Sequence, residues 1–157
     1  MPKPKCRCCS ETAVDEVSLC PECGLPGPAV PDETVDALLT QEALARRQAV
    51  TYHFCESPTC PVAYYSDDGA SIFTTDDLRV RVGEKETAPP RPLCYCFGHT
   101  YESVREEWQR TGRTTVVEQI EAAMRREGCR CRTANPRGSC CLPQVRRFVV
   151  ALGTESV

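Results

Sequence analysis

Cysteines in closely spaced groups are the residues of this chain best suited to chemistry. Thirteen of the 157 residues are cysteine, and they form C-x-C, C-C and C-x-x-C motifs rather than being scattered. The first residues, MPKPKCRCC, contain no apolar signal-peptide core, and the longest late apolar run, residues 148–152, is too short to span a bilayer. In a reducing compartment such cysteine groups are typical of metal or redox ligands. We therefore expect a cytoplasmic, metal-binding protein rather than a disulfide scaffold.

Two cysteine pairs in the first half have the spacing of a structural zinc site. Cys20 and Cys23 belong to the knuckle CPECG, and Cys55 and Cys60 follow beyond a predicted helix. Paired thiolates at these spacings can reach a tetrahedral Zn²⁺ at about 2.3 Å. The sequence therefore predicts zinc bound by these four cysteines. Free buried thiols, another metal or another choice of ligands are the alternatives.

The second half contains three more pairs, Cys94 with Cys96, Cys129 with Cys131, and Cys140 with Cys141. A C-x-C loop followed by later cysteines across two helices suits an iron–sulfur cluster, which needs four thiolates. The later ligands would lie on a loop and at a helix start, where free amides and the helix dipole stabilise negative charge. Ser139 is the expected N-cap of that helix, and Gly98 would let the chain pass close to the cluster. Zinc is the alternative occupant of these thiols.

The remaining cysteines and the two histidines have weaker signals. Cys6, Cys8 and Cys9 could bind a soft ion such as Cu(I), or form a mobile tail that lends a thiolate to the zinc. We expect His99 to cap or support a ligand rather than bind metal itself. His53, on a predicted strand before Cys55, is interpreted as a half-buried residue, with a spare zinc ligand as the alternative.

Short elements must position the first-half cysteines. Residues 31–48 show the apolar spacing of a helix, which Thr40 could divide in two by capping a second one. After it the period changes to short β-branched and aromatic runs. Strands are expected at residues 50–55, 62–66, 71–75 and 78–82, with a turn at residues 67–69. The first half should thus hold a small antiparallel sheet of three or four strands.

The second half is predicted to be helical. Helices are expected at residues 100–112, 115–128 and about 140–152, with a turn at residues 133–138. Val104 and Trp108 lie on one face of the first of these helices. Thr115 and Glu118 have the spacing of a capping box at the start of the second. A proline-rich stretch at residues 84–92 separates the halves, because proline resists helix and central strand.

Charge also differs between the halves. Residues 1–88 carry fifteen acidic and eight basic side chains, a net charge of −7, whereas residues 89–157 carry seven acidic side chains and eleven arginines, a net charge of +4. We therefore predict an α+β chain of two subdomains. Residues 1–88 would form the zinc-binding sheet with a helix, and residues 89–157 the helical cluster-binding part.

Several motifs together resemble a known family. CPECG, YHFCESPTCPVAYYS and DDLRVRVGEKE resemble the zinc-binding part of the amino-terminal domain of CopZ-type copper chaperones. CYCFGHT and CRTANPRGSCCLPQV resemble the 2Fe–2S domain of the bacterioferritin-associated-ferredoxin-like (BFD-like) group. The resemblance covers roughly residues 5–150 and keeps the family's order of cysteines. It implies one zinc ion and one 2Fe–2S cluster in a redox-active unit.

The resemblance also implies a ligand set. Cys94 and Cys96 map onto the family's first two cluster ligands, Cys131 onto the third, and Cys141 onto the fourth, with Cys140 as its substitute. Cys129 is then an extra thiol without a role. Full chaperones of this type continue into a heavy-metal-associated domain with an M-x-C-x-x-C loop, which this sequence is expected to lack.

The function expected from these features is one-electron transfer in cellular metal handling. The chain would help to keep copper, or another soft metal, reduced for a copper transporter or a separate heavy-metal-binding chaperone, together with a redox partner. The alternative is a two-zinc adaptor that binds protein or nucleic acid, although the acidic half would repel phosphates. The sequence shows no phosphate-binding loop or nucleophile elbow, so we expect no catalytic residues and no hydrolytic or acyl-transfer activity.

Overall fold

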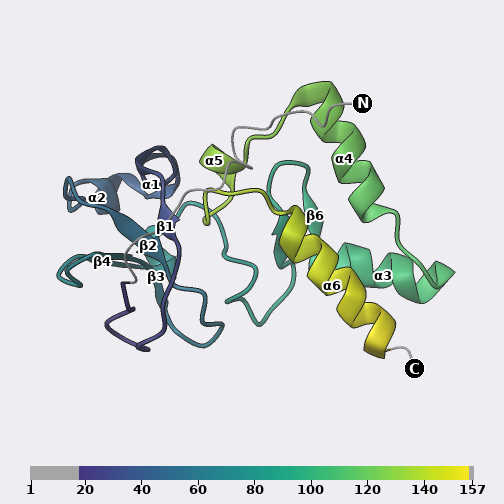
Figure 1. Ribbon diagram of the computed structural model, residues 1–157, viewed down its shortest axis with the longest axis horizontal. Helices are drawn as coiled ribbons and strands as arrows, with labels where there is room; N and C mark the ends of the chain where they lie inside the picture. Colours follow the sequence, from purple (N-terminus) through teal and green to yellow (C-terminus); the bar gives the residue numbers. More distant parts are fainter. Residues whose placement is uncertain (1–17, 156–157) are drawn as a thin grey trace.

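Short strands and helices alternate along the first half of the chain, and longer helices dominate the second. The structure is a computed structural model that describes residues 18–155. Figure 1 shows the sheet with α1 and α2 at one end of the molecule and α3, α4 and α6 at the other, with α5 between them. This mixed arrangement of a small antiparallel sheet and helices confirms the predicted α+β class.

The first half is built on a four-stranded antiparallel sheet in the order β1-β2-β3-β4. The strands are β1 (Ala29–Val30), β2 (Tyr52–Phe54), β3 (Val62–Ser66) and β4 (Ile72–Thr74). In the register His53 lies opposite Tyr65, and a bulge interrupts the pairing of β3 with β4. All residues of β2 and β3 are buried, which explains their apolar and aromatic composition.

The helical segment of the first half is divided as the sequence predicts. Helix α1 (Asp32–Leu38) ends before Thr40, and α2 (Gln41–Leu44) begins directly after it. The Thr40 hydroxyl accepts a hydrogen bond from the amide of Ala43 at 3.2 Å, which satisfies one of the free N–H groups of α2. The prediction that Thr40 caps a second helix is therefore confirmed.

The strand predicted at residues 78–82 is wrong. Leu78 and Val82 are buried and Arg79 and Arg81 are exposed, so the burial alternates as expected. However, this segment forms only an isolated bridge between Leu78 and Leu39, after the 3₁₀ turn η2 (Thr75–Asp77). Its backbone bonds the connection between α1 and α2 instead of a neighbouring strand. The fourth strand of the sheet is β1, which lies outside every segment in which a strand was expected.

The second half opens with a two-stranded hairpin of β5 (Pro92–Cys94) and β6 (His99–Thr100). Three helices of eleven or more residues follow, with a short one before the last. They are α3 (Tyr101–Thr111), α4 (Val116–Glu127), α5 (Cys131–Ala134) and α6 (Leu142–Glu155). Helices α3 and α4 end at Gly112 and Gly128, both with positive φ, as expected for helix C-termini.

Two predicted caps of these helices are wrong. Thr115 precedes α4 without capping it, because its hydroxyl donates to Glu107 and accepts from the side chain of Gln119. Ser139 lies too early to cap α6, which starts at Leu142. The carbonyl that accepts the first helical bond, from the amide of Val145 at 3.0 Å, belongs to Cys141. Cys141 thus occupies the N-cap position itself.

Buried apolar side chains gather in separate clusters in the two halves. One lies between the sheet and α1 and includes Tyr52, Phe54, Tyr64 and Phe73. A second joins the hairpin to α3, α4 and α6. A third, small cluster surrounds Cys20, Cys55 and Cys60. The division at residues 88 and 89 remains a prediction, but the boundary falls between the first two clusters.

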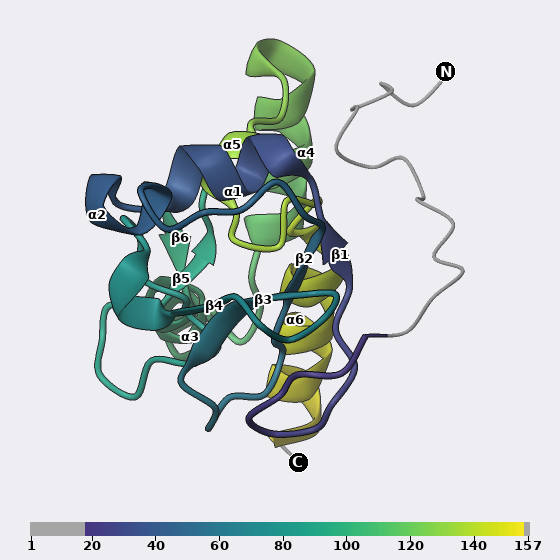
Figure 2. The ribbon, with the colours of Figure 1, turned by 90° about the vertical axis from the view of Figure 1, so that its left-hand side faces the viewer.

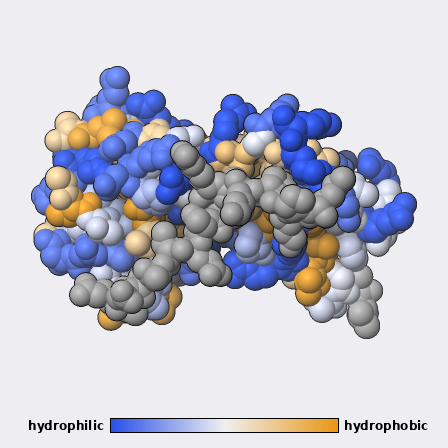
Figure 3. All heavy atoms as spheres, turned by 45° about the horizontal axis from the view of Figure 1, so that its top comes forward, coloured by the Kyte–Doolittle hydropathy of each residue, from blue (hydrophilic) through white to orange (hydrophobic). Residues whose placement is uncertain are grey.

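The halves meet where α5 packs against α1, as Figure 2 shows from the side of the sheet. On the face drawn in Figure 3, apolar side chains form small separate groups among hydrophilic ones. Among residues 18–155 no helix is both long enough and apolar enough to cross a lipid bilayer.

Candidate metal centres

Four cysteines of the first half converge on one point from two loops. Cys20 and Cys23 lie on a tight turn, in which the amide of Gly24 bonds the carbonyl of Cys20 at 2.8 Å. Gly24 has φ of +75°, a conformation that other residues rarely adopt. Cys55 directly follows β2, and Cys60 lies two residues before the start of β3. The sheet and the knuckle therefore each supply two thiols.

The spacing of these thiols fits a tetrahedral ion. The sulfur atoms of Cys20 and Cys60 are 3.9 Å apart, and those of Cys23 and Cys55 are 3.7 Å apart. All four lie within 4.8 Å of one another. A tetrahedron with Zn–S distances of about 2.3 Å has edges of about 3.8 Å. Three of the four side chains are buried and Cys23 is partly exposed, as in a closed structural site.

The thiols of this site differ in acidity. Burial raises the pKa of Cys55 to about 12, and burial also raises the pKa of Cys60. A backbone hydrogen bond from Leu25 outweighs burial and lowers the pKa of Cys23. Because zinc binds thiolates, its binding must displace the protons that burial retains on Cys55 and Cys60.

His53 is not available as a spare zinc ligand. Its Nδ1 contacts the carbonyl oxygen of Gly27 at 3.2 Å, and its Nε2 contacts the carboxylate of Asp67. The ring stacks on Tyr65 at 5.4 Å and is 3% exposed. His53 is therefore a buried, hydrogen-bonded residue of the sheet, and both nitrogen atoms are engaged.

A second group of thiols gathers around the hairpin of the second half. Cys94 ends β5 and Cys96 lies in the following turn, which the amide of Gly98 closes onto the carbonyl of Cys94 at 3.0 Å. Gly98 has φ of +75°, and a Cβ there would meet nothing within 4 Å. The glycine serves the turn conformation, and its close approach to a cluster stays a prediction.

The two later ligands predicted for this group come from helix starts. Cys131 begins α5, and Cys141 precedes α6. The sulfur atoms of Cys96 and Cys131 are 3.3 Å apart. Cys141 hydrogen-bonds with both Cys131 and Cys94, so these four thiols form a continuous series. The structure thus places the four cysteines predicted to hold the cluster in one region, where Cys96 packs against the buried cluster that contains the other three.

Hydrogen bonding separates the acidities of these four thiols. Donation from the thiols of Cys131 and Cys94 lowers the pKa of Cys141 to about 4. The same bonds, together with burial, raise the pKa of Cys94 and Cys131. The pKa of Cys96 is lowered, mainly by its hydrogen bond with Cys131. Position at the N-terminus of α6 further favours negative charge on Cys141.

Two more cysteines border this group. The sulfur atoms of Cys96, Cys129 and Cys131 all lie within 4.8 Å of one another, but Cys129 is disulfide-bonded and therefore offers no thiol. Cys140 hydrogen-bonds with Cys131 and is only partly buried, whereas Cys141 is 2% exposed. The described residues thus supply five thiols here, one more than a single cluster requires.

Comparisons with known proteins identify the family to which this chain belongs. A family described as "Zinc binding domain" (zf_CopZ) matches residues 17–79, a segment that contains all four cysteines of the first site. The X-ray structure of the Archaeoglobus fulgidus CopZ N-terminal domain superposes with a TM-score of 0.71 and 32% sequence identity. The match covers 83% of this chain and 96% of that domain. This chain belongs to the CopZ family.

The CopZ relationship extends to a curated full-length protein. The copper chaperone CopZ of Archaeoglobus fulgidus is 32% identical over 136 residues, which are 87% of this chain. The chain spans 64% of the length of that relative. The predicted resemblance to the amino-terminal domain of CopZ-type chaperones is thereby confirmed.

Sequence reasoning missed a polar network that lies between the two sites of this CopZ-family chain. Arg137 lies between Cys131 and Cys140 in sequence, and it pairs with Glu84 and Glu56 of the other half. Glu56 directly follows Cys55. The only signal in the sequence was the position of Glu56 beside Cys55, because the pairing of these charges depends on how the halves meet.

Two further residues of the hairpin, Tyr95 and His99, lie beside the second group of cysteines. The hydroxyl of Tyr95 accepts a hydrogen bond from the amide of Gly83 at 3.0 Å. His99 lies opposite Cys94 in the hairpin and belongs to neither group of described side chains close enough to share an ion. A cavity of about 560 Å³, lined by Cys96, Phe97, His99 and residues of α4, opens beside the hairpin. Cys6, Cys8 and Cys9 lie outside the described residues.

Proposed function

We propose that the first site holds one structural Zn²⁺ on Cys20, Cys23, Cys55 and Cys60. Support comes from the tetrahedral spacing of the four sulfur atoms and from the family's description as a zinc-binding domain. No described thiol in this site is surplus, and burial excludes the open position that a catalytic zinc keeps. Residues 1–88 would then form the zinc-binding subdomain.

For the second site we propose a 2Fe–2S cluster held by Cys94, Cys96, Cys131 and Cys141, with Cys140 as the substitute for the last. The observation that carries the proposal is the convergence of these thiols on the hairpin and two helix starts. Such a cluster supplies one-electron transfer when bound. Arginines near the site, of which Arg130 donates its backbone amide to the sulfur of Cys96 at 3.3 Å, offset negative charge. Residues 89–157 would form this BFD-like subdomain.

The resulting function is electron transfer in metal handling. Cys96 is the one proposed cluster ligand that is partly exposed, and it borders the cavity beside α4. It therefore marks the edge at which a redox partner exchanges electrons. The name of the Archaeoglobus relative points to copper as the client metal. In the cytoplasm the chain would keep copper as Cu(I) for a transporter or another chaperone, with Cys6, Cys8 and Cys9 as a possible transfer site.

Anaerobic purification with metal analysis and a visible spectrum tests this function. We expect one zinc and two irons per chain, and a brown colour that dithionite bleaches by one electron. The reduced protein mixed with Cu²⁺ and a Cu(I)-specific chelator should then yield one trapped Cu⁺ per cluster as the colour returns. Protein loaded with zinc but free of iron is the control for reduction by thiols.

Two results would overturn the proposal. A colourless protein with two zinc ions and no iron would favour the two-zinc adaptor that the sequence left as an alternative. A coloured protein whose cluster is not reoxidised by Cu²⁺ would retain the cluster and remove copper reduction from its function.

A further inference from the structure

The loop between the third and fourth proposed cluster ligands rests on the zinc-binding half. We call residues 131–141 the ligand loop. The hydroxyl of Thr34, on α1, donates to the carbonyl of Arg132 at 2.5 Å. The hydroxyl of Tyr64, on β3, donates to the carbonyl of Pro136 at 2.6 Å. Both donors are buried, so the loop is held by bonds that water does not replace.

The ligand loop is also fixed internally by Asn135. Its side-chain oxygen accepts from the amide of Arg137 at 3.0 Å, and its side-chain nitrogen donates to the carbonyl of Ser139 at 3.0 Å. Asn135 is 1% exposed. At Gly138 a Cβ would lie 2.5 Å from the hydroxyl oxygen of Thr34, so the loop backbone packs directly on α1.

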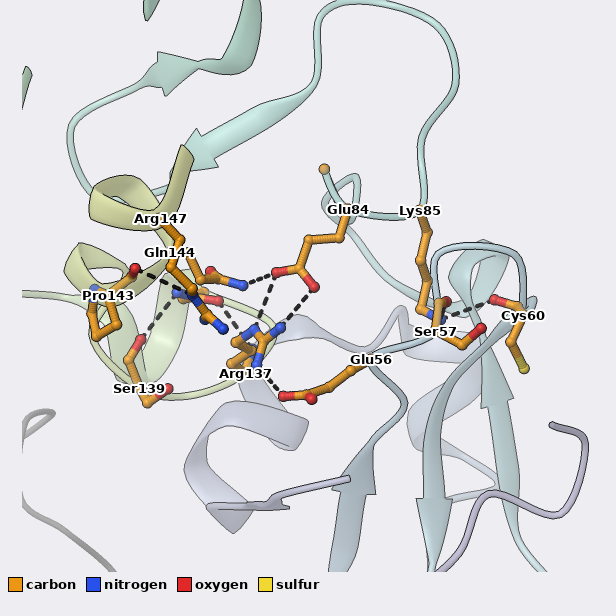
Figure 4. A network of polar contacts seen from close by, with 12 residues as sticks. Glu56, Ser57, Cys60, Glu84, Lys85, Arg137, Ser139, Pro143, Gln144 and Arg147 are labelled. Carbon is orange, nitrogen blue, oxygen red and sulfur yellow. Dashed lines mark hydrogen bonds and ion pairs between the residues drawn. The ribbon is translucent and has the colours of Figure 1, made fainter. Parts of the chain in front are cut away.

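Arg137 carries the strongest link between the loop and the other half (Figure 4). Its guanidinium donates to both carboxylate oxygens of Glu84, at 3.1 and 2.8 Å, and to the carboxylate of Glu56. It lies 5.2 Å from the centre of the Phe54 ring, and its side chain is 15% exposed. Such a bidentate, largely buried pair depends on both partners staying in place.

Lys85, the neighbour of Glu84, binds the loop between Cys55 and Cys60. The Lys85 ammonium donates to the carbonyl oxygens of Ser57 at 2.6 Å and Cys60 at 2.9 Å. Figure 4 shows the two side chains reaching in different directions from adjacent positions. Glu84 thus holds the ligand loop while Lys85 holds the loop between Cys55 and Cys60. Zinc with four thiolates is negatively charged, and the Lys85 charge offsets it.

We propose that Glu84, Lys85 and Arg137 form a strap through which zinc occupancy holds the ligand loop in the arrangement that retains the cluster. The inference rests on the proposed function, because it takes the first site to bind zinc and the second to bind the cluster. Zinc fixes Cys55 and Cys60, and with them the acceptors of Lys85 and the position of Glu56. When zinc is absent, Arg137 loses the fixed carboxylates on which the loop depends. Arg137 is therefore a positioning residue for the cluster ligands.

A four-protein cycle tests this coupling with the full chain. Wild type, Cys20→Ser, Arg137→Gln and the double variant are loaded with metal anaerobically, and cluster loss is followed by the decay of visible absorption. Residues that orient metal ligands typically change metal retention by about 10-fold when mutated. We expect cluster loss to accelerate about 10-fold in each single variant, and less than about two-fold further in the double variant.

The matched control is Arg146→Gln. Arg146 lies on α6 and pairs with Glu121 at 2.6 Å, but its side chain is 56% exposed and the pair stays within the second half. Its cluster loss should match wild type, and Cys20→Ser should accelerate loss in that background as much as in wild type. If Arg137 had only a structural role, Cys20→Ser would still accelerate cluster loss in the Arg137→Gln background.

Other outcomes overturn the inference. If Cys20→Ser leaves cluster loss unchanged, or if the effects of Cys20→Ser and Arg137→Gln multiply, the strap does not transmit zinc occupancy. If Arg137→Gln fails to fold, Lys85→Met replaces it, since this change cuts the zinc end of the strap alone.

A cluster-independent measurement separates this inference from the proposed function. Amide hydrogen exchange of residues 131–141 is compared in iron-free protein with and without zinc. Protection that falls on zinc removal in wild type, but is already low and unaffected by zinc in Arg137→Gln, supports the strap even if no cluster is found. Protection that does not depend on zinc contradicts the strap, whether or not the wild type carries a cluster.

Discussion

The two thiol sites of this chain differ in how many thiols they contain relative to the number of ligands that a metal centre needs. The first brings four sulfur atoms to nearly equal separations, 3.7 and 3.9 Å across two pairs, and the described residues add no further thiol. The second gathers five thiols of unequal burial around a hairpin and two helix starts, beside the disulfide-bonded Cys129. The first site has as many thiols as a single ion needs, and the second has one thiol more than a cluster needs.

The difference indicates what each site is built to do. Four largely buried thiols, supplied by a sheet and a knuckle, leave no open coordination position and suit a structural ion that stays bound. The second site has one partly exposed proposed ligand, Cys96, which lines a cavity, and this suits a centre that exchanges electrons with a partner. The polar network at Glu84, Lys85 and Arg137 physically joins the two.

The largest expected effect follows from breaking the first site. Cys60→Ser should reduce the zinc content from one ion per chain to none, because no other described thiol can replace it. Loss of a structural zinc costs about 4 kcal/mol or more, which lowers Tm by about 10 °C or more for a chain of this size. Metal analysis and calorimetry measure both quantities.

The matched control lies in the loop between Cys55 and Cys60. Ser57→Ala keeps the backbone carbonyl that accepts from Lys85 at 2.6 Å, and it should retain full zinc content. Full zinc content or an unchanged Tm in Cys60→Ser would show that the four sulfur atoms are close for reasons other than a shared ion.

A smaller effect distinguishes the adjacent cysteines of the second site. Cys141→Ser should bleach the visible colour, because Cys141 is 2% exposed and bonds both Cys131 and Cys94. Cys140→Ser, the matched control, should keep the colour. The visible spectrum and iron content decide. Equal bleaching by both changes, or bleaching by Cys140→Ser alone, would contradict Cys141 as the fourth ligand.

The pairing of cysteines within each motif was predictable from sequence because it needs only a local turn of the backbone. Two thiols of a C-x-x-C or C-x-C motif can reach one ion when the residues between them turn, so Cys20 with Cys23 and Cys94 with Cys96 could be paired without knowledge of the fold. Pairing of motifs across the sheet followed from their order along the chain. The helix division at Thr40 was predictable for the same reason, since capping is a local interaction.

Interactions between distant segments were not predictable. The alternation at residues 78–82 gave the correct burial but not the backbone partner, which is the connection between α1 and α2. Nothing near Arg137 in sequence specifies Glu84 as its partner, 53 residues away. Ser139 was a reasonable N-cap by residue type, but the loop stays irregular until Leu142 because Asn135 closes it onto the carbonyl of Ser139.

The smallest expected effect concerns a part of the second half that is organised without metal. Glu107 accepts hydrogen bonds from the hydroxyl of Thr114 at 2.9 Å, and from the amide and hydroxyl of Thr115 at 3.1 Å each. Burial raises the pKa of Glu107, but these bonds outweigh it and leave the pKa lowered. Because the carboxylate is partly exposed, Glu107→Gln should lower the free energy of unfolding by only about 1 kcal/mol.

The lowered pKa of Glu107 determines how the stability difference between wild type and Glu107→Gln changes with pH. A lowered pKa means that the carboxylate contributes stability above its ordinary pKa of 4.5, and that the contribution is lost as pH falls through the lowered value. The difference between wild type and Glu107→Gln in denaturant unfolding should therefore be full at pH 7 and shrink as the pH falls below the ordinary pKa of 4.5. Glu106→Gln, at an exposed neighbour, should show no such difference. Zinc content and colour should be unchanged in both variants, and a loss of either in Glu107→Gln would mean that the turn between α3 and α4 also supports the second thiol site.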